Sequence, residues 1–458
     1  MTPIRCARAV EPPRNCNSRA VAHPGPVLYS AVMQFTIARM RSTAGIRTHH
    51  LPARIARAGS RAILTLGTTA LIACATPNET ALEGQSAQAI AEMTAPIILF
   101  KGNTGNGGAE VHHSYRIPAI VNAGDGRLVA VAEGRVDSAA DEGNINLVMR
   151  RSLDNGATWL DQVQIWNAPD RLGTIGNPTL VYDALNDRVW LFASENDSKH
   201  SLGGAGGLIP VGVGDRRTWA RYSDTKGSSW SDPVNLTSFV TPADYTWDAM
   251  GPGAGIQMIG GAKAGRLVIP AKGRIIVSDN AGGTWTSLPT NDAPLNETTV
   301  SELQNPAGGL YVNARSQDPD VLRRQIKRSS DDGRSWSAWA SDAALLEKPC
   351  EASVLKFTPG GIWRTLFFNP ASTVNRIKMR VRISYDGGVT WPISREVDAG
   401  QGGYSSMAAT SDSHIAALYE SGGGDDDFLD IKFTKFNVSW ILNGAAEPAA
   451  AALDRAGP

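Results

Sequence analysis

Ser152-Leu-Asp-Asn-Gly-Ala-Thr-Trp159 is the first of five related stretches in this chain of 458 residues. The other four end at Trp230, Trp285, Trp336 and Trp391, so the tryptophans lie 51 to 71 residues apart. The residue types suit a tight turn between two strands: Ser and Asp accept backbone N–H groups, Gly adopts positive φ, and Trp packs against the sheet. Repetition at this period is typical of β-propeller blades.

These stretches, called Asp boxes, differ in completeness. Three of them, 152–159, 329–336 and 384–391, keep every key residue or a close substitute. The other two have Thr225 and Asn280 where Asp is expected. Five boxes in order predict an architecture, but they do not by themselves predict an activity.

The region around the boxes is a series of short alternating strands separated by Gly, Asn and Asp turns. It starts at Pro96 and continues to about Val438, without a convincing helical period. We expect an all-β fold, a six-bladed β-propeller of four-stranded blades over residues 96–440, because closure into a ring allows one all-β domain to be this large. The Ala-rich residues 441–458 are predicted to be a disordered tail.

The N-terminal segment has the charge of a leader. Residues 1–73 contain ten Arg, no Lys and one acidic residue, whereas the whole chain has 44 basic and 44 acidic side chains. A cationic leader on an acidic domain favours export and argues against nucleic-acid binding. Residues 1–39 fit no ordinary leader and are interpreted as a start-site extension, with Met33 or Met40 as the more natural start.

A lipoprotein signal peptide is predicted at residues 40–74. The apolar run Ala62–Ala73 is too short to span a bilayer, and Leu71-Ile-Ala-Cys74 resembles the bacterial lipobox. We expect lipidation of Cys74, a tether at 75–95, and an exported bacterial protein that is periplasmic, cell-surface or outer-membrane lipoprotein, or secreted. The alternative is cleavage later, after Ala87 or Ala89.

Cysteine and histidine usage predicts neither a disulfide nor a metal or cofactor in the folded domain. Cys350 is its single cysteine, and we expect it to be a small buried apolar residue. The pair His112-His113 lacks metal-ligand spacing and is interpreted as a loop feature.

Three arginines lie in distinctive settings: Arg116 in Tyr-Arg-Ile-Pro, Arg315 in Asn-Ala-Arg-Ser, and Arg376 shortly after Phe-Asn-Pro370. With the Asp boxes, these motifs resemble the exo-sialidases (neuraminidases), and the resemblance covers residues 96–438. In that family three arginines bind the carboxylate of sialic acid, which suits the planar guanidinium fork. Nearby competitors for the third position are Arg380 and Arg382.

The resemblance also implies a nucleophile and two acidic partners. Tyr404 in Gly-Tyr-Ser-Ser matches the family's nucleophilic tyrosine, and Glu297 matches the Glu that activates it. Glu302 is the rival for the second role. Glu420 matches the acidic residue that braces the first arginine.

An acid/base residue is implied in the loop after Glu133-Gly-Arg135. Asp141 is the candidate, and Asp137 stays open because the loop is about one residue longer than the family pattern implies. Arg135 is expected to support the substrate or this loop.

Weaker matches outline the rest of the pocket. Asn177-Pro178 and Gly251-Pro252-Gly253 resemble loops at its floor, and three further residues lie where substrate contacts are common: Tyr245, Trp247 and Asp248.

Together these features predict an exo-α-sialidase that acts with retention through a covalent tyrosyl intermediate. The implied substrates are sialylated glycans, glycoproteins or gangliosides, and the expected membrane contact is the lipid anchor of a monomer. Alternatives are a trans-sialidase, a hydrolase of a related nonulosonic acid, or a non-catalytic lectin-like propeller. The last is disfavoured because the candidate catalytic positions are all occupied.

Overall fold

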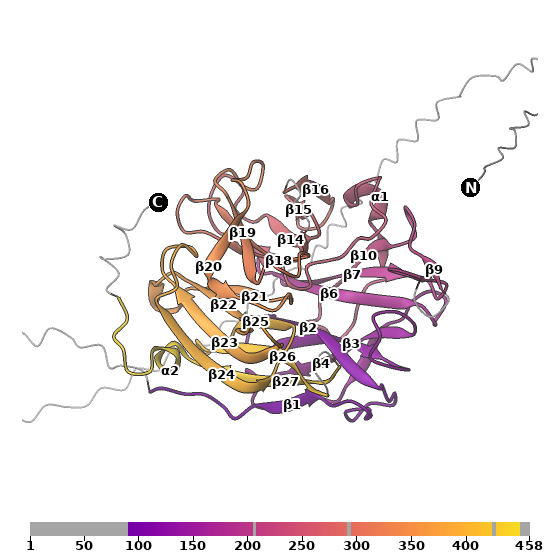
Figure 1. Cartoon of the computed structure of the whole chain (residues 1–458), viewed down its shortest axis with the longest axis horizontal. Coiled ribbons are helices and arrows are strands. Elements are labelled where there is room, and N and C mark those ends of the chain that lie inside the picture. Colours follow the sequence, from indigo (N-terminus) through magenta and orange to yellow (C-terminus); the bar gives the residue numbers. More distant parts are fainter. Residues whose placement is uncertain (1–89, 205–207, 291–294, 424–426, 449–458) are drawn as a thin grey trace, which may run out of the picture. The chain divides into compact units, whose positions relative to one another are not determined.

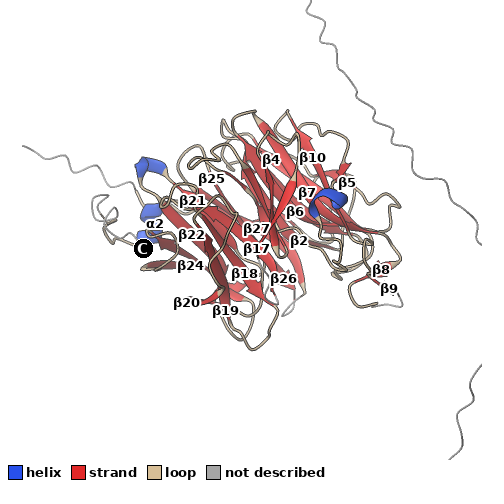
Figure 2. Ribbon diagram, turned by 90° about the horizontal axis from the view of Figure 1, so that it is seen from above, coloured by secondary structure: helices blue, strands red, loops and turns tan. Residues whose placement is uncertain are grey.

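Antiparallel strands make up almost all of the regular structure (Figure 2). The computed structural model describes residues 90–204, 208–290, 295–423 and 427–448. Helices there are short: α1 (Thr237–Val240), α2 (Val438–Leu442) and a 3-10 turn at Pro359–Gly361. No helix in this described part is long and apolar enough to cross a membrane. The leader, Cys74 and most of the expected tether lie outside the described residues.

Four sheets have four strands each (Figure 1). The first joins the two ends of the domain in the order β1 (Ile97–Phe100), β27 (Phe428–Phe436), β26 (Ile415–Gly423) and β25 (Ser405–Ala409). The other three follow chain order, with these strands: β13 (Ile256–Gln257), β14 (Leu267–Ala271), β15 (Arg274–Ser278), β16 (Thr286–Pro289); β17 (Leu295–Glu302), β18 (Leu310–Ser316), β19 (Arg323–Ser329), β20 (Ala340–Leu346); β21 (Ser353–Phe357), β22 (Arg364–Pro370), β23 (Ile377–Ser384), β24 (Ile393–Gln401).

A larger sheet of nine strands contains the earlier part of the chain. One half is built from β2 (Ser114–Asn122), β3 (Leu128–Arg135), β4 (Ile145–Ser152) and β5 (Val163–Trp166), and the other from β6 (Thr174–Asp183), β7 (Arg188–Asn196), β10 (Arg217–Ser223) and β11 (Val234–Asn235). The halves meet at a single parallel pair, Ile145 with Thr174. β12 (Gly253–Ala254) also pairs with β6, and β8 (His200–Ser201) pairs with β9 (Ile209–Pro210). The fold is an all-β propeller, but these pairings do not establish the expected number of six blades.

Apolar layers between neighbouring sheets form the core. Inner strands such as β2 and β3 are buried on both faces, which explains their near-continuous apolar sequences. Each box tryptophan packs in a different layer: Trp159, Trp230, Trp285, Trp336 and Trp391. One further layer receives no box tryptophan and contains Trp440 of α2 instead. The boxes therefore stabilise the packing between sheets as well as the turns.

The five boxes form the same turn despite their sequence differences. In the fourth box, Asp331 accepts the backbone N–H of Ser335 at 2.8 Å and its hydroxyl at 2.7 Å. Thr225 accepts the N–H of Ser229 at 2.8 Å, and Asn280 accepts that of Thr284 at 2.9 Å. One acceptor at this position is sufficient for the turn.

Residues just outside 96–440 also contact the ends of the propeller. At the start, Met93 pairs with Phe436, and the Asn437 side chain donates to the Ile90 carbonyl at 2.7 Å, so the tether ends before residue 95. At the end, α2 extends past residue 440, and Glu447 forms an ion pair with Arg364. These residues are ordered because buried apolar side chains and a charge pair bind them to the ring.

Candidate active site

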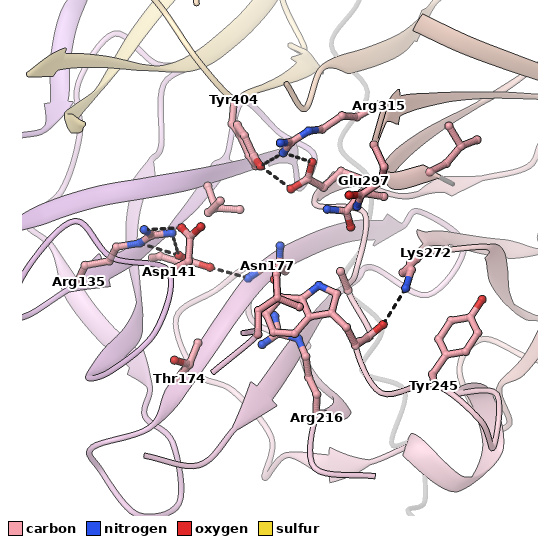
Figure 3. Close-up of a pocket in the computed structure, with 18 residues that line it drawn as sticks. Arg135, Asp141, Thr174, Asn177, Arg216, Tyr245, Lys272, Glu297, Arg315 and Tyr404 are labelled. Carbon is pink, nitrogen blue, oxygen red and sulfur yellow. Dashed lines mark hydrogen bonds and ion pairs between the residues drawn. The ribbon is translucent and has the colours of Figure 1, made fainter. Parts of the chain in front are cut away.

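A cavity of about 680 Å³ opens where the inner strands meet (Figure 3). Several elements contribute to its wall: β3, β6, β17, β18 and the segment before β25. The predicted site residues that line it are Arg135, Asp141, Asn177, Tyr245, Trp247, Glu297, Arg315 and Tyr404, whereas Arg116, Arg376 and Glu420 lie outside this wall. The ring therefore brings together residues that are far apart in the sequence.

Tyr404, Glu297 and Arg315 form a hydrogen-bonded triangle (Figure 3). The Tyr404 hydroxyl donates to Glu297 Oε1, while Arg315 Nη1 lies 2.7 Å from both the Tyr404 oxygen and Glu297 Oε2. Burial, together with the negative charge of Glu297, raises the pKa of the Tyr404 phenol well above its usual value, whereas Arg315 acts in the opposite direction. The phenol is thus neutral at rest and has a carboxylate ready to take its proton.

The rival Glu302 lies elsewhere. It forms an ion pair with Lys356 at 2.5 Å and accepts the backbone N–H of Gly260 at 2.7 Å. Glu297 and Glu302 share β17, but the pairing of this strand with β18 shifts between Leu295 and Thr298, and the two side chains reach different partners. The structure thus places Glu297, and not Glu302, beside Tyr404.

Glu420 connects Arg116 to the tyrosine segment. Its carboxylate is fully buried and accepts Arg116 Nε at 2.7 Å, the Ile117 N–H at 2.9 Å and the Tyr404 N–H at 2.9 Å. Burial alone would lower the pKa of Arg116, but the charges of Glu420 and Asp141, with the hydrogen bond to Glu420, raise that pKa. The guanidinium therefore stays charged, with its orientation fixed by the bond at Nε.

Arg376 completes a group of three guanidinium groups around Tyr404. Its Cζ atom lies 5.8 Å from the centre of the Tyr404 ring, and that of Arg116 lies 5.7 Å from the same centre. Arg376 also donates to the Pro349 carbonyl at 2.9 Å. The competitors point elsewhere, since Arg380 contacts Glu396 and Arg382 donates to Asn369.

Asp141 lies at the mouth of the cavity, bound to a buried arginine. Arg135 Nη1 is 2.7 Å from Asp141 Oδ1, and Glu133 holds the other side of the same guanidinium at 2.7 Å. The Asp141 side chain is 76% exposed. Partial desolvation raises its pKa, but the charges of Arg135, Arg116 and Arg315 outweigh that effect and lower it. Asp137 is exposed and does not line the cavity.

Only some of the residues with weaker family matches lie in the cavity wall. Asn177, Tyr245 and Trp247 line the cavity. Asp248 does not, because it is buried against Arg274 at 2.7 Å. Gly251 and Gly253 do not line the cavity, and Gly253 pairs with Thr179 of β6.

Sequence reasoning missed two cationic residues in the wall, Arg216 and Lys272 (Figure 3). Arg216 is buried and donates to Asn177 Oδ1 at 2.7 Å, and its guanidinium stacks on Trp247 at 3.9 Å. Burial lowers the pKa of Arg216 to about 10. Lys272 donates to the Trp247 carbonyl at 3.1 Å. Neither residue belongs to a short motif, so no sequence signal distinguished them from surface cations.

Cys350 is buried, as expected, and packs with Ile117 beneath Tyr404. Burial raises the pKa of its thiol to about 12, so the thiol is inert at neutral pH. Within the described residues, no group of three His, Cys, Asp or Glu side chains could hold a metal ion.

The arrangement suits an anionic substrate. Three arginines surround a neutral phenol, so a carboxylate can bind there by charge-assisted bonds. Glu297 supplies a base for the phenol, and Asp141 supplies a second carboxyl at the opening. These are the elements of a two-step displacement.

Comparison with known proteins agrees with this chemistry. The family model of the BNR repeat-like domain matches residues 126–417. The chain is 38% identical over 361 residues to an exo-alpha-sialidase of Aspergillus fumigatus, covering 72% of this chain and 86% of that protein. It is 37% identical to an exo-alpha-sialidase of Arthroderma benhamiae, covering 72% and 85%. The structure of the Hadza microbial sialidase Hz136 superimposes with a TM-score of 0.61, at 26% identity, over 72% of this chain and 67% of that one.

Proposed function

We propose a retaining mechanism with Tyr404 as nucleophile for this chain, which belongs to the exo-sialidase family and hydrolyses terminal sialic acids. The observation that carries the proposal is the contact of the Tyr404 hydroxyl with both Glu297 and Arg315. A carboxylate nucleophile would be repelled by the substrate's own carboxylate, whereas a neutral phenol carries no charge and avoids this repulsion. Glu297 removes the phenolic proton only as the new bond forms.

The arginines bind the substrate's carboxylate in this scheme. Arg116, Arg315 and Arg376 surround the Tyr404 ring, so a carboxylate held by them places the adjacent anomeric carbon near the phenol oxygen. The Nε atom of Arg116 is occupied by Glu420, which leaves its terminal nitrogens for the ligand. Such positioning converts the attack into an intramolecular step.

Asp141 is the proposed acid and base. In the free enzyme its lowered pKa keeps it ionised against Arg135, Arg116 and Arg315. A bound substrate carboxylate offsets the charges of Arg116 and Arg315, so the pKa of Asp141 rises and the residue takes up a proton. Substrate binding and acid formation are therefore coupled.

The reaction has two displacements. In the first, the Tyr404 oxygen bonds to the anomeric carbon, Glu297 takes the phenolic proton, and the bond to the leaving oxygen breaks as Asp141 protonates that oxygen. In the second, Asp141 takes a proton from water, the water oxygen bonds to the same carbon, and Tyr404 departs and regains its proton from Glu297. Two inversions give net retention.

The test combines trapping with product analysis. A fluorinated sialosyl fluoride should label the enzyme, and peptide mapping should place the label on Tyr404. Proton NMR of a running reaction should show the α-anomer of free sialic acid before mutarotation. Label on a carboxylate, or a β-anomer formed first, would overturn the mechanism, and a sialylated acceptor as main product would replace hydrolysis by transfer.

For the architecture, we propose six blades. The nine-stranded sheet then counts as two blades, one of β2–β5 and one of β6, β7, β10 and β11, because these halves share a single residue pair. An apolar layer lies between those halves, as between the other sheets. An experimental structure that showed continuous pairing along β4 and β6 would contradict this division.

For location, we propose export as a lipoprotein that acts on sialylated glycans, glycoproteins or gangliosides. Leu71-Ile-Ala-Cys74 after an apolar run supports lipidation of Cys74. Cys74→Ala should release the enzyme into the soluble fraction or block processing. An unlipidated mature protein that begins after Cys74, shown by intact mass, would refute the anchor. The monomeric state stays a prediction.

A further inference from the structure

Glu351 is a buried carboxyl without a basic partner. It is 2% exposed, and among the described residues no Lys, Arg or His forms an ion pair with it. Other buried glutamates are paired: Glu302 with Lys356, Glu347 with Arg324 and Glu420 with Arg116. An isolated buried carboxylate is strongly disfavoured, so such a group remains protonated.

Glu351 contacts the backbone of the nucleophile segment. Its Oε2 accepts the N–H of Ser405, the residue after Tyr404, at 2.7 Å. Glu420 accepts the N–H of Tyr404 itself at 2.9 Å. Two carboxyl groups on different blades therefore hold two consecutive peptide N–H groups and limit how Tyr404 can move.

The surroundings of Glu351 explain why its carboxyl, and not that of Glu420, should be neutral. Glu297 on β17 and Glu420 on β26 disfavour its ionised form, whereas the Ser405 N–H and the positive charge of Arg324 on β19 favour it. Burial is the largest effect and raises the pKa of Glu351 well above its usual value. Its second oxygen, Oε1, has no hydrogen-bond partner among the described residues, which leaves room for a proton there.

We propose that Glu351 is a positioning residue that works as a neutral carboxylic acid, fixing the Tyr404–Ser405 backbone without adding negative charge beside the nucleophile. Its carbonyl oxygen accepts the Ser405 N–H, while the proton resides on Oε1. A third anion there would make deprotonation of Tyr404 harder, because Glu297 already faces the phenol. The inference rests on the role proposed for Tyr404 above.

Two substitutions test the position and the charge separately. Glu351→Ala removes the acceptor and leaves a buried N–H unpaired, so kcat should fall about tenfold or more while KM changes little, since the arginines are untouched. Glu351→Gln retains a neutral acceptor of the same shape and should recover most of that kcat. The matched control is Glu302→Gln, a buried glutamate outside the cavity, which should alter stability and leave kcat unchanged.

Infrared difference spectra measure protonation directly, even if Glu351→Ala fails to fold. Wild type minus Glu351→Gln at neutral pH should show the C=O stretch of a protonated carboxylic acid, and the Glu302→Gln difference should not. A carboxylate band instead, or a Glu351→Gln enzyme as slow as Glu351→Ala, would overturn the proposal. Label trapped away from Tyr404 would refute the catalytic mechanism, but it would leave the infrared result for Glu351 standing.

Discussion

The Asp-box turns and the active-site cavity are both networks of short polar contacts, but they differ in sequence range. In the fourth box, every bond of Asp331 to Ser329, Arg334 and Ser335 joins residues at most four positions apart. In the cavity, Tyr404 contacts a residue 107 positions away, and Arg116 contacts one 304 positions away. The turn forms from its own eight residues, whereas the cavity exists only when the ring is closed.

This difference predicts a separation of stability from activity. Substitutions in a box should weaken the fold and leave the chemistry intact, because the box tryptophans pack between sheets. Substitutions in the cavity should abolish the chemistry with smaller effects on the fold. Each experiment below tests whether the two regions separate in this way.

Tyr404→Phe should have the largest effect. Without the phenol oxygen no covalent intermediate can form, so kcat should fall by about a thousandfold or more. The melting temperature should change little, because the ring still fills its site. Tyr182→Phe removes a hydroxyl bonded to Asp187 outside the cavity and serves as the control. A kcat for Tyr404→Phe close to that of the control would break the comparison.

Asp141→Ala should come next and should depend on the leaving group. Substrates with poor leaving groups should lose about a hundredfold in kcat/KM. Activated aryl sialosides should lose far less, because their aryl leaving groups depart without a proton. The ratio of the two losses is the measurement. Asp137→Ala, on the same loop but outside the cavity, should leave both rates unchanged. If Asp137→Ala gave the selective loss, the assignment of the acid would be wrong.

Arg116→Lys should cost about 2 kcal/mol of transition-state stabilisation in kcat/KM, because an ammonium cannot bind a carboxylate bidentately. The charge opposite Glu420 is retained, so the fold should survive, as circular dichroism can check. Arg380 contacts Glu396, whereas Arg116 lies against the Tyr404 ring, so Arg380→Lys should be neutral. Equal kcat/KM values for the two variants would remove Arg116 from the substrate site.

Asp331→Asn should have the smallest effect and should act on stability alone. We expect a loss of about 1 kcal/mol or less in the free energy of unfolding, since water can replace bonds in an open turn. Hydrogen bonding, first of all by the Ser335 hydroxyl, lowers the pKa of Asp331 to about 2.

The sign of the pH effect follows from that lowered pKa. The ionised form is favoured in the folded state, so its contribution is complete above the unfolded pKa of about 4 and disappears as the pH falls through about 2. Urea melts should therefore show the gap between wild type and Asp331→Asn closing over this window. Asp320→Asn, on an exposed loop, should show no such closure. A change in kcat for Asp331→Asn would contradict the separation of the two regions.

The same comparison explains what could be predicted from the sequence. Local motifs identified the boxes and the segments of Arg116, Arg315 and Tyr404. The family resemblance already favoured Glu297 over Glu302, but the contact of Glu297 with Tyr404 arises only in the folded chain. Arg216 and Lys272 were missed because their place in the cavity depends only on how distant strands meet.

The C-terminal end of the propeller and the number of its blades were harder to predict for a similar reason. The Ala-rich composition after residue 440 suggested a tail, yet Ile441 packs in a layer between sheets and Glu447 pairs with Arg364. The number of blades depends on one residue pair, which joins two sheets into one. Both questions concern contacts between segments distant in sequence.

The pairing of β1 with β27 has a consequence for the order in which the segments must follow one another along the chain (Figure 1). Ile90 and Asn437 are hydrogen bonded, so the two ends of the propeller are neighbours and a short peptide can join them. A ring joined in this way can be opened at an exposed turn such as the one containing Asp125, and the strands would still meet in the same order around the circle. We therefore expect a circularly permuted chain, which begins at that turn, to form the same catalytic cavity.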